Sequence, residues 1–241
     1  MLTLREHDVD DYVGLPDMDT TDVGVLSEDD RACLDELGRY LTAYDASQRF
    51  GIWLLHKHFE PAPGEVFVER AIGAARKTET APVRRSALDG QELSVTSIRF
   101  DGDDEAGVVG MEFAAVDEFG DTAPLSADDE AVLAGVAERL QAHGKIERFG
   151  VRLIRNPLGL SAHELLLETC DSAQRTLYCD VSERDAVLGP KTIETTWRWK
   201  VIQGRGEPTV MQECQAACVP AIAQGHDISH RNFLDDDFGN D

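Results

Sequence analysis

Two histidines separated by one residue are the chemically most distinctive feature of this sequence. His56 and His58 follow a short apolar segment that begins at Phe50, so we expect them at the end of a β-strand. Side chains two residues apart on a strand point the same way, which places the pair on the face of Phe50, Ile52 and Leu54, the predicted core side. Two imidazoles at the rim of an apolar interior can bind a divalent metal, zinc or iron, or act as a general acid and base.

A metal at this position needs a third ligand. The nearest carboxylates along the chain are Glu60, Glu65 and Glu69, and the last two share one face of the next predicted strand. We take Glu65 as the candidate third ligand, although the hairpin register that would aim it at the histidines does not follow from the sequence. The alternative is a polar strand end at which the histidines and glutamates are solvated.

A second set of metal-binding residue types lies near the C-terminus. Cys214 and Cys218 precede His226 and His230, and two thiols with two imidazoles make a complete tetrahedral zinc set. The spacer between the two pairs is shorter than in zinc fingers, and the alanines between the cysteines also fit a small apolar helix in which the thiols pack. A further alternative is a mixed site in which a tail histidine joins the pair of the first half.

Two other pairs have a structural and a functional interpretation. Cys170 and Cys179 flank a bend, where they could react as a nucleophile or redox pair, but we expect them to be packed in the core. Trp197 and Trp199 share one face of a predicted strand and form either a core wall or a ligand platform; we expect the wall.

An internal repeat organises these residues. When the chain is shifted by 99 residues against itself, residues 26–83 match 125–182 with 16 identities in 58 positions, against roughly four expected by chance. Each copy begins with a predicted helix, because Ser27 and Ser126 fit N-cap positions and a periodic apolar stripe follows each of them. Short alternating segments then predict strands near 50–54, 64–70, 76–83, 93–101 and 107–116, with counterparts in the second copy.

One helix followed by strands predicts an α+β fold. We expect two copies of a helix plus antiparallel sheet unit, of hot-dog or cystatin type, packed with pseudo-two-fold symmetry and with a pocket at their junction. The predicted domains are an acidic arm at 1–25, copy one at 26–118, copy two at 119–212 and a Cys/His-containing segment with an acidic tail at 213–241.

Composition and charge limit the partners. The chain has 241 residues, 42% of them hydrophobic, and a formal net charge of −23, which repels nucleic-acid phosphates and anionic lipid. No apolar run is long enough to span a membrane, the opening residues are charged, and the cysteine count of five is odd, so we expect a cytoplasmic protein without a disulfide framework. Gly-rich phosphate loops and GxSxG or HExxH motifs are absent from the sequence, which disfavours nucleotide-dependent and α/β-hydrolase chemistry.

These observations lead to three hypotheses of different classes. The first is an enzyme of small-molecule metabolism with His56 and His58 as metal ligands or catalytic acid and base. The second is a non-catalytic acidic module that binds a ligand or a basic protein, and the third is an acidic mimic of nucleic acid. The sequence leaves open whether the chain forms a homodimer.

Overall fold

The structure is a computed structural model of the chain. It describes residues 3–18, 21–72, 75–102, 107–116, 118, 124–155, 158–189, 192–202 and 209–219.

Strands account for most of the regular structure. The strands are β1 (Thr3–Glu6), β2 (Phe50–Leu54), β3 (Glu65–Ala71), β4 (Lys77–Arg84), β5 (Leu93–Phe100), β6 (Gly107–Ala115), β7 (Phe149–Leu153), β8 (Glu164–Asp171), β9 (Thr176–Glu183), β10 (Ile193–Ile202) and β11 (Thr209–Cys218). The helices are α1 (Asp10–Val13), α2 (Glu28–Ala43), α3 (Ala127–Ala142) and α4 (Arg184–Val187), with 3-10 turns η1 (Thr21–Gly24) and η2 (Arg85–Leu88). Among the described residues, no helix is both long and apolar enough to cross a membrane.

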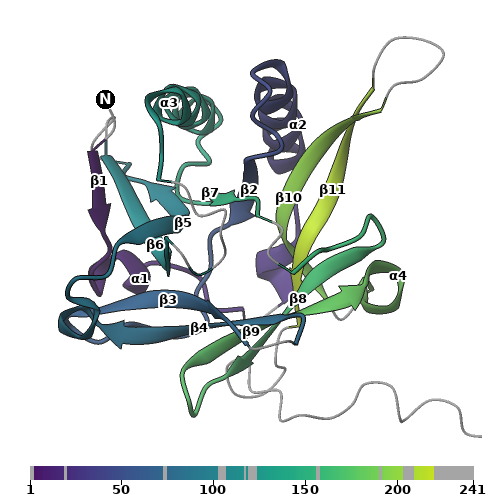
Figure 1. The fold of residues 1–241 in the computed structure, drawn as a ribbon. Helices are drawn as coiled ribbons and strands as arrows, with labels where there is room; N and C mark the ends of the chain where they lie inside the picture. Colours follow the sequence, from purple (N-terminus) through teal and green to yellow (C-terminus); the bar gives the residue numbers. More distant parts are fainter. Residues whose placement is uncertain are drawn as a thin grey trace, which may run out of the picture.

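Ten of the eleven strands in the described ranges close into a barrel (Figure 1). Around the ring the order is β6-β3-β4-β9-β8-β11-β10-β2-β7-β5, and pairing of β5 with β6 closes it. β1 adds to β6 in parallel, next to the part of β6 that β3 does not cover. Each of the ten barrel strands therefore has a paired neighbour on both sides, although the pairing of β10 with β2 covers only Thr196 and Trp197.

The predicted fold is wrong. We expected two helix-plus-sheet units of hot-dog or cystatin type, whereas the strands of both halves pair with each other in one barrel. β4 pairs with β9, where Lys77 faces Asp180, and β2 pairs with β7, where Ile52 faces Val151. Alternating residues identify a strand but do not specify its neighbour, and these long-range pairings decide the fold.

The elements nevertheless recur at the offset found in the sequence. α2 and α3 begin 99 residues apart, as do β2 and β7, β3 and β8, and β4 and β9. The predicted boundary between residues 118 and 119 falls between β6 and α3, whereas the one between 212 and 213 falls inside β11. The last strand of the second half is therefore part of the barrel.

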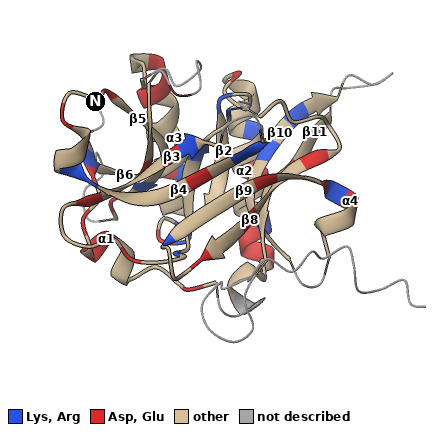
Figure 2. Ribbon diagram, turned by 60° about the horizontal axis from the view of Figure 1, so that its bottom comes forward, with Lys and Arg blue, Asp and Glu red and all other residues tan. Residues whose placement is uncertain are grey.

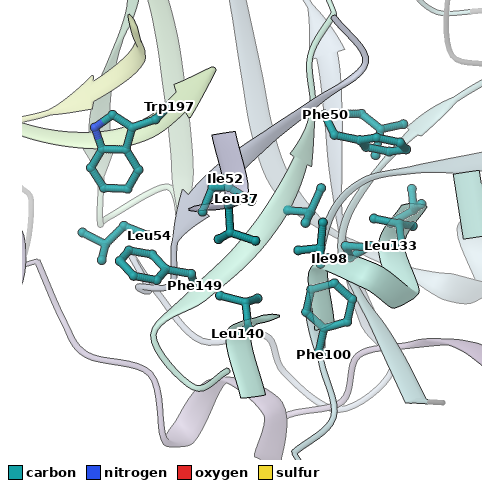
Figure 3. Packing of buried hydrophobic residues seen from close by; sticks show 14 of the residues in the cluster. Leu37, Phe50, Ile52, Leu54, Ile98, Phe100, Leu133, Leu140, Phe149 and Trp197 are labelled. Atoms are coloured by element: carbon teal, nitrogen blue, oxygen red, sulfur yellow. The ribbon is translucent and has the colours of Figure 1, made fainter. Parts of the chain in front are cut away.

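The two long helices lie side by side over one face of the barrel wall (Figure 1). Both predicted N-caps are confirmed: Ser27 and Ser126 each form a capping box with the aspartate three residues later. Apolar side chains of α2 and α3 pack against β2, β5, β7 and β10 in the main core (Figure 3). Trp197 and Trp199 are buried in this core, so they form the expected wall.

Strands β2 and β7 separate this core from the barrel interior. Phe50, Ile52 and Leu54 of β2 belong to the core beneath the helices. Trp53, which alternates with them, belongs to a second apolar cluster that also contains Phe67 of β3. On this second face, β7 carries Arg152 at the position 99 residues after Trp53. The barrel interior therefore contains buried polar residues as well as apolar ones.

Candidate metal centre

His56 lies just beyond the end of β2 and is only 2% exposed. Its Nδ1 lies 2.7 Å from the carbonyl oxygen of Leu54. Because a carbonyl only accepts hydrogen bonds, Nδ1 carries the proton, and the lone pair of the neutral ring is on Nε2. The backbone therefore orients the imidazole as it orients the histidines that bind metals.

The predicted face of His56 differs from the observed one. We expected its ring beside Ile52 and Leu54, but β2 ends at Leu54 and the strand alternation ends with it. The ring instead meets Trp53 edge-on, with 5.7 Å between ring centroids, and lines a cavity with it.

His58 and Glu168 bring two further ligand atoms to His56. Nε2 of His58 donates a hydrogen bond to Nε2 of His56 at 3.1 Å, and Oε2 of Glu168 lies 4.0 Å from Nε2 of His56. One ligand atom from each residue lies within 4.8 Å of the other two. Ligands of a tetrahedral zinc ion are about 3.4 Å apart, given zinc–nitrogen distances of about 2.0–2.1 Å. The three side chains therefore lie close to the spacing that a metal ion requires.

Glu168, on β8, is held through both of its carboxylate oxygens. Thr195 donates its hydroxyl hydrogen to Oε2 at 2.9 Å, and Arg152 donates from Nη1 to Oε1 at 3.1 Å. All three residues are buried. Metal-bound carboxylates are commonly positioned by such hydrogen bonds, so Glu168 is oriented before any ion arrives.

Buried charges around Arg152 do not balance. Acidic and basic residues are interspersed along the barrel strands (Figure 2), and the buried carboxylates of Glu69, Glu112 and Glu168 meet two guanidinium groups. Arg152 lies 3.1 Å from Glu168 and 3.4 Å from Glu112, and Arg155 pairs with Glu69. With His56 neutral, this group carries one excess negative charge, which a cation or a proton must offset.

Burial shifts the pKa values in this cluster. It lowers the pKa of His56 to about 4, so the ring stays neutral near pH 7. It also raises the pKa values of Glu168 and Glu112 above their ordinary range, which reflects the cost of their buried charges. Burial works against the charge of Arg152, but Glu112 and Glu168 raise the pKa of its guanidinium.

The three candidate ligands line a small cavity, which we call the histidine cavity. A water-sized sphere can move its centre through about 20 Å³ of it, so the cavity can hold an ion with a ligand of a few atoms and nothing larger. The other lining residues are Tyr12, Trp53, Lys57, Phe59, Phe67, Thr80, Glu112, Arg152 and Leu177. A second cavity, the arginine cavity, also includes Arg152 and is lined by Glu69, Thr78, Leu153, Ile154, Arg155, Leu158, Leu160, Leu166, Thr196, Gln215 and Ala216.

Glu65, the third ligand chosen from the sequence, lies elsewhere. Its carboxylate accepts hydrogen bonds from Arg175 and from the backbone N–H of Ala62, both at 2.8 Å. Glu168, which takes its place beside the histidines, belongs to the other half and could not be reached by local spacing. A signal did exist: Glu69 and Glu168 are identical residues 99 positions apart, and both are buried.

The cysteines pack in the interior. All five are buried and form no disulfide among the described residues, and burial raises the pKa values of Cys179, Cys214 and Cys218. Cys214 and Cys218 lie on β11 instead of the small apolar helix considered from the sequence. Their predicted zinc partners, His226 and His230, lie outside the described residues.

Comparisons of this chain with protein-family models, curated proteins and solved structures find no match.

Proposed function

We propose that this protein is a metal-dependent enzyme of small-molecule metabolism whose metal ion is bound by His56, His58 and Glu168. The observation that carries the proposal is the convergence of their ligand atoms within 4.8 Å in a buried cavity. Two imidazoles and one carboxylate are a ligand set of catalytic zinc, and also of non-haem iron when further positions stay open.

Three features favour a bound cation over an inert polar cluster. The lone pair on Nε2 of His56 needs no deprotonation, because the hydrogen bond to Leu54 holds the proton on the other nitrogen. Hydrogen bonds from Thr195 and Arg152 orient the carboxylate of Glu168. The excess buried negative charge around Arg152 favours a positive ion in this place.

A metal with only three protein ligands keeps a position for water or substrate. A metal held by His56, His58 and Glu168 would supply Lewis acidity and would lower the pKa of a bound water. Glu112 lines the same cavity, and its Oε2 lacks a hydrogen bond among the described residues. This carboxylate is suitably placed to accept or return a proton during the reaction.

The direct test is the metal content of the purified protein, measured by mass spectrometry after exposure to Zn²⁺ or Fe²⁺ and removal of free ions. We expect the wild type to retain metal, and His56→Ala with His58→Ala, or Glu168→Gln alone, to lose it. Glu65→Gln is the matched control, because it removes a carboxylate charge outside the cluster and should retain metal. A wild type without metal, or a double variant that still retains it, would disprove the site.

Catalysis needs a separate readout. Hydration of carbon dioxide, a molecule of three atoms that suits the small cavity, reports metal-activated water without knowledge of the natural substrate. We expect turnover that requires both the metal and the histidines. Tight metal binding without any metal-dependent turnover would favour the second class of function, a non-catalytic binding module.

A further inference from the structure

Two buried hydrogen-bond donors in the histidine cavity have no protein acceptor. Nε1 of Trp53 and Oγ1 of Thr80 lack a hydrogen-bond partner among the described residues, and the two side chains are 4% and 2% exposed. An unpaired buried polar group destabilises the fold, because it loses its hydrogen bonds to water and gains none in the protein. Both residues line the same cavity as His56, His58 and Glu168, so a ligand there could accept from them.

The indole fixes the chemistry of that ligand. Trp53 can only donate, so its partner must be an acceptor atom, whereas the hydroxyl of Thr80 can donate as well as accept. An oxygen of a carboxylate or carbonate matches both residues. The apolar side chains of Phe59, Phe67 and Leu177 surround the same space, in which the carboxylate acceptors are Glu112 and Glu168.

The buried charges indicate the charge of the ligand, and the free volume of the cavity limits its size. With a divalent ion bound to neutral histidines, the ion and Arg152 contribute three positive charges, and Glu112 and Glu168 contribute two negative ones. One excess positive charge then remains in a buried place, and a single anionic charge neutralises it. The small free volume restricts the anion to a few atoms.

We propose that the histidine cavity binds a small carboxylate-type monoanion, of the size of formate or bicarbonate, between the metal ion and the donors of Trp53 and Thr80. This inference rests on the proposed metal centre and names the class of its substrate or product. The metal ion provides the charge, and the indole N–H and the hydroxyl orient the oxygens.

The test uses Co²⁺-loaded protein, whose visible absorption changes when the ligands of the ion change. Formate, bicarbonate and benzoate are titrated separately. Formate and bicarbonate should alter the spectrum, which separates the two small-anion sources by affinity, and benzoate should not because it exceeds the cavity. Trp53→Phe and Thr80→Val should each weaken formate binding about tenfold while Co²⁺ content stays unchanged.

Thr78→Val is the matched control. Thr78 is also a buried threonine of β4 with an unpartnered hydroxyl among the described residues, but it lines the arginine cavity. Its variant should bind formate like the wild type. If Co²⁺ binds but formate leaves the spectrum unchanged, or binds equally to all three variants, the anion site is disproved and the metal centre stands. If Co²⁺ does not bind to the wild type, both proposals fall.

Discussion

The histidine cavity and the arginine cavity share Arg152, and each contains one of two equivalent buried glutamates. The two glutamates differ in the residue that they face. Glu69 of β3 and Glu168 of β8 lie 99 residues apart, and each faces the second residue after a strand of the other half, β7 for Glu69 and β2 for Glu168. In the arginine cavity this residue is Arg155, which forms an ion pair with Glu69. In the histidine cavity it is His56, whose neutral ring adds no charge, so Glu168 has only Arg152, which it shares with Glu112.

The difference separates structure from function. An arginine supplies its own charge, so the Glu69 pair is complete within the chain. A neutral imidazole supplies a lone pair, which needs a metal ion before it can compensate a carboxylate. At equivalent positions, Arg155 thus forms an ion pair within the chain, whereas His56 offers a lone pair to a cation from outside it.

The largest expected loss of stability comes from breaking the buried ion pair of Arg155 with Glu69. Arg155→Met leaves Glu69 buried without its partner, and we expect the free energy of unfolding to fall by about 3–5 kcal/mol in urea denaturation. Adding Glu69→Gln should restore much of the loss, because no buried charge then remains. Arg85→Met, which breaks the exposed pair with Glu6, is the control and should change stability little. An equal loss in Arg155→Met and Arg85→Met would contradict the account of the arginine cavity.

Lower pH should destabilise the metal-free histidine cavity. The pKa of His56 is about 4 in the folded protein, against 6.5 for an ordinary histidine. Between these values the unfolded chain binds a proton that the folded chain does not, so stability falls as the pH drops from 6.5 to 4. The loss on this residue is about 3 kcal/mol. Urea unfolding of chelator-treated protein measures it, and the difference between wild type and His56→Gln isolates it from other groups. A pH-independent difference would mean that His56 is not buried as a neutral ring.

Metal binding should distinguish the two cavities directly. At zinc concentrations a hundredfold above Kd, binding stabilises the wild type by about 2.7 kcal/mol, which thermal unfolding with and without zinc detects. His56→Arg reproduces the arrangement of Arg155 and should pair with Glu168, so zinc should no longer stabilise the variant. Persistent stabilisation by zinc in His56→Arg would place the ion elsewhere.

The smallest expected loss of stability concerns the helix N-caps, in which the two halves have the same structure. Ser27 and Ser126 accept hydrogen bonds from the backbone N–H groups of Asp30 and Asp129 at 3.1 and 3.2 Å. Ser27→Ala and Ser126→Ala should each cost about 1 kcal/mol of unfolding free energy. Clearly unequal losses would show that the two helices do not contribute alike to the scaffold.

Local patterns predicted the parts of this protein better than their assembly. The N-caps at Ser27 and Ser126 and the strands that begin at Phe50 and Phe149 follow from short-range periodicity, and the structure confirms them. The pairing of β4 with β9 depends on contacts about 100 residues apart, which no local pattern encodes, and the predicted α+β class was therefore wrong.

At the candidate metal centre, too, local spacing predicted some features and long-range contacts decided the others. The spacing of His56 and His58 predicted two imidazoles close together, and their Nε2 atoms are 3.1 Å apart. The direction of the His56 side chain could not be predicted, because β2 ends at Leu54 and the alternation of side chains ends with it. Glu168 could not be predicted from the nearest carboxylates, because a closed barrel brings β8 of one half to the end of β2 of the other.

X-ray absorption at the edge of the bound metal tests the central claim most directly, because the fine structure identifies the ligand atoms. We predict a shell of nitrogen and oxygen that includes two imidazoles and no sulfur, which matches His56, His58 and Glu168. A shell containing sulfur would instead indicate Cys214 and Cys218, and purified protein that retains no metal would contradict the account altogether.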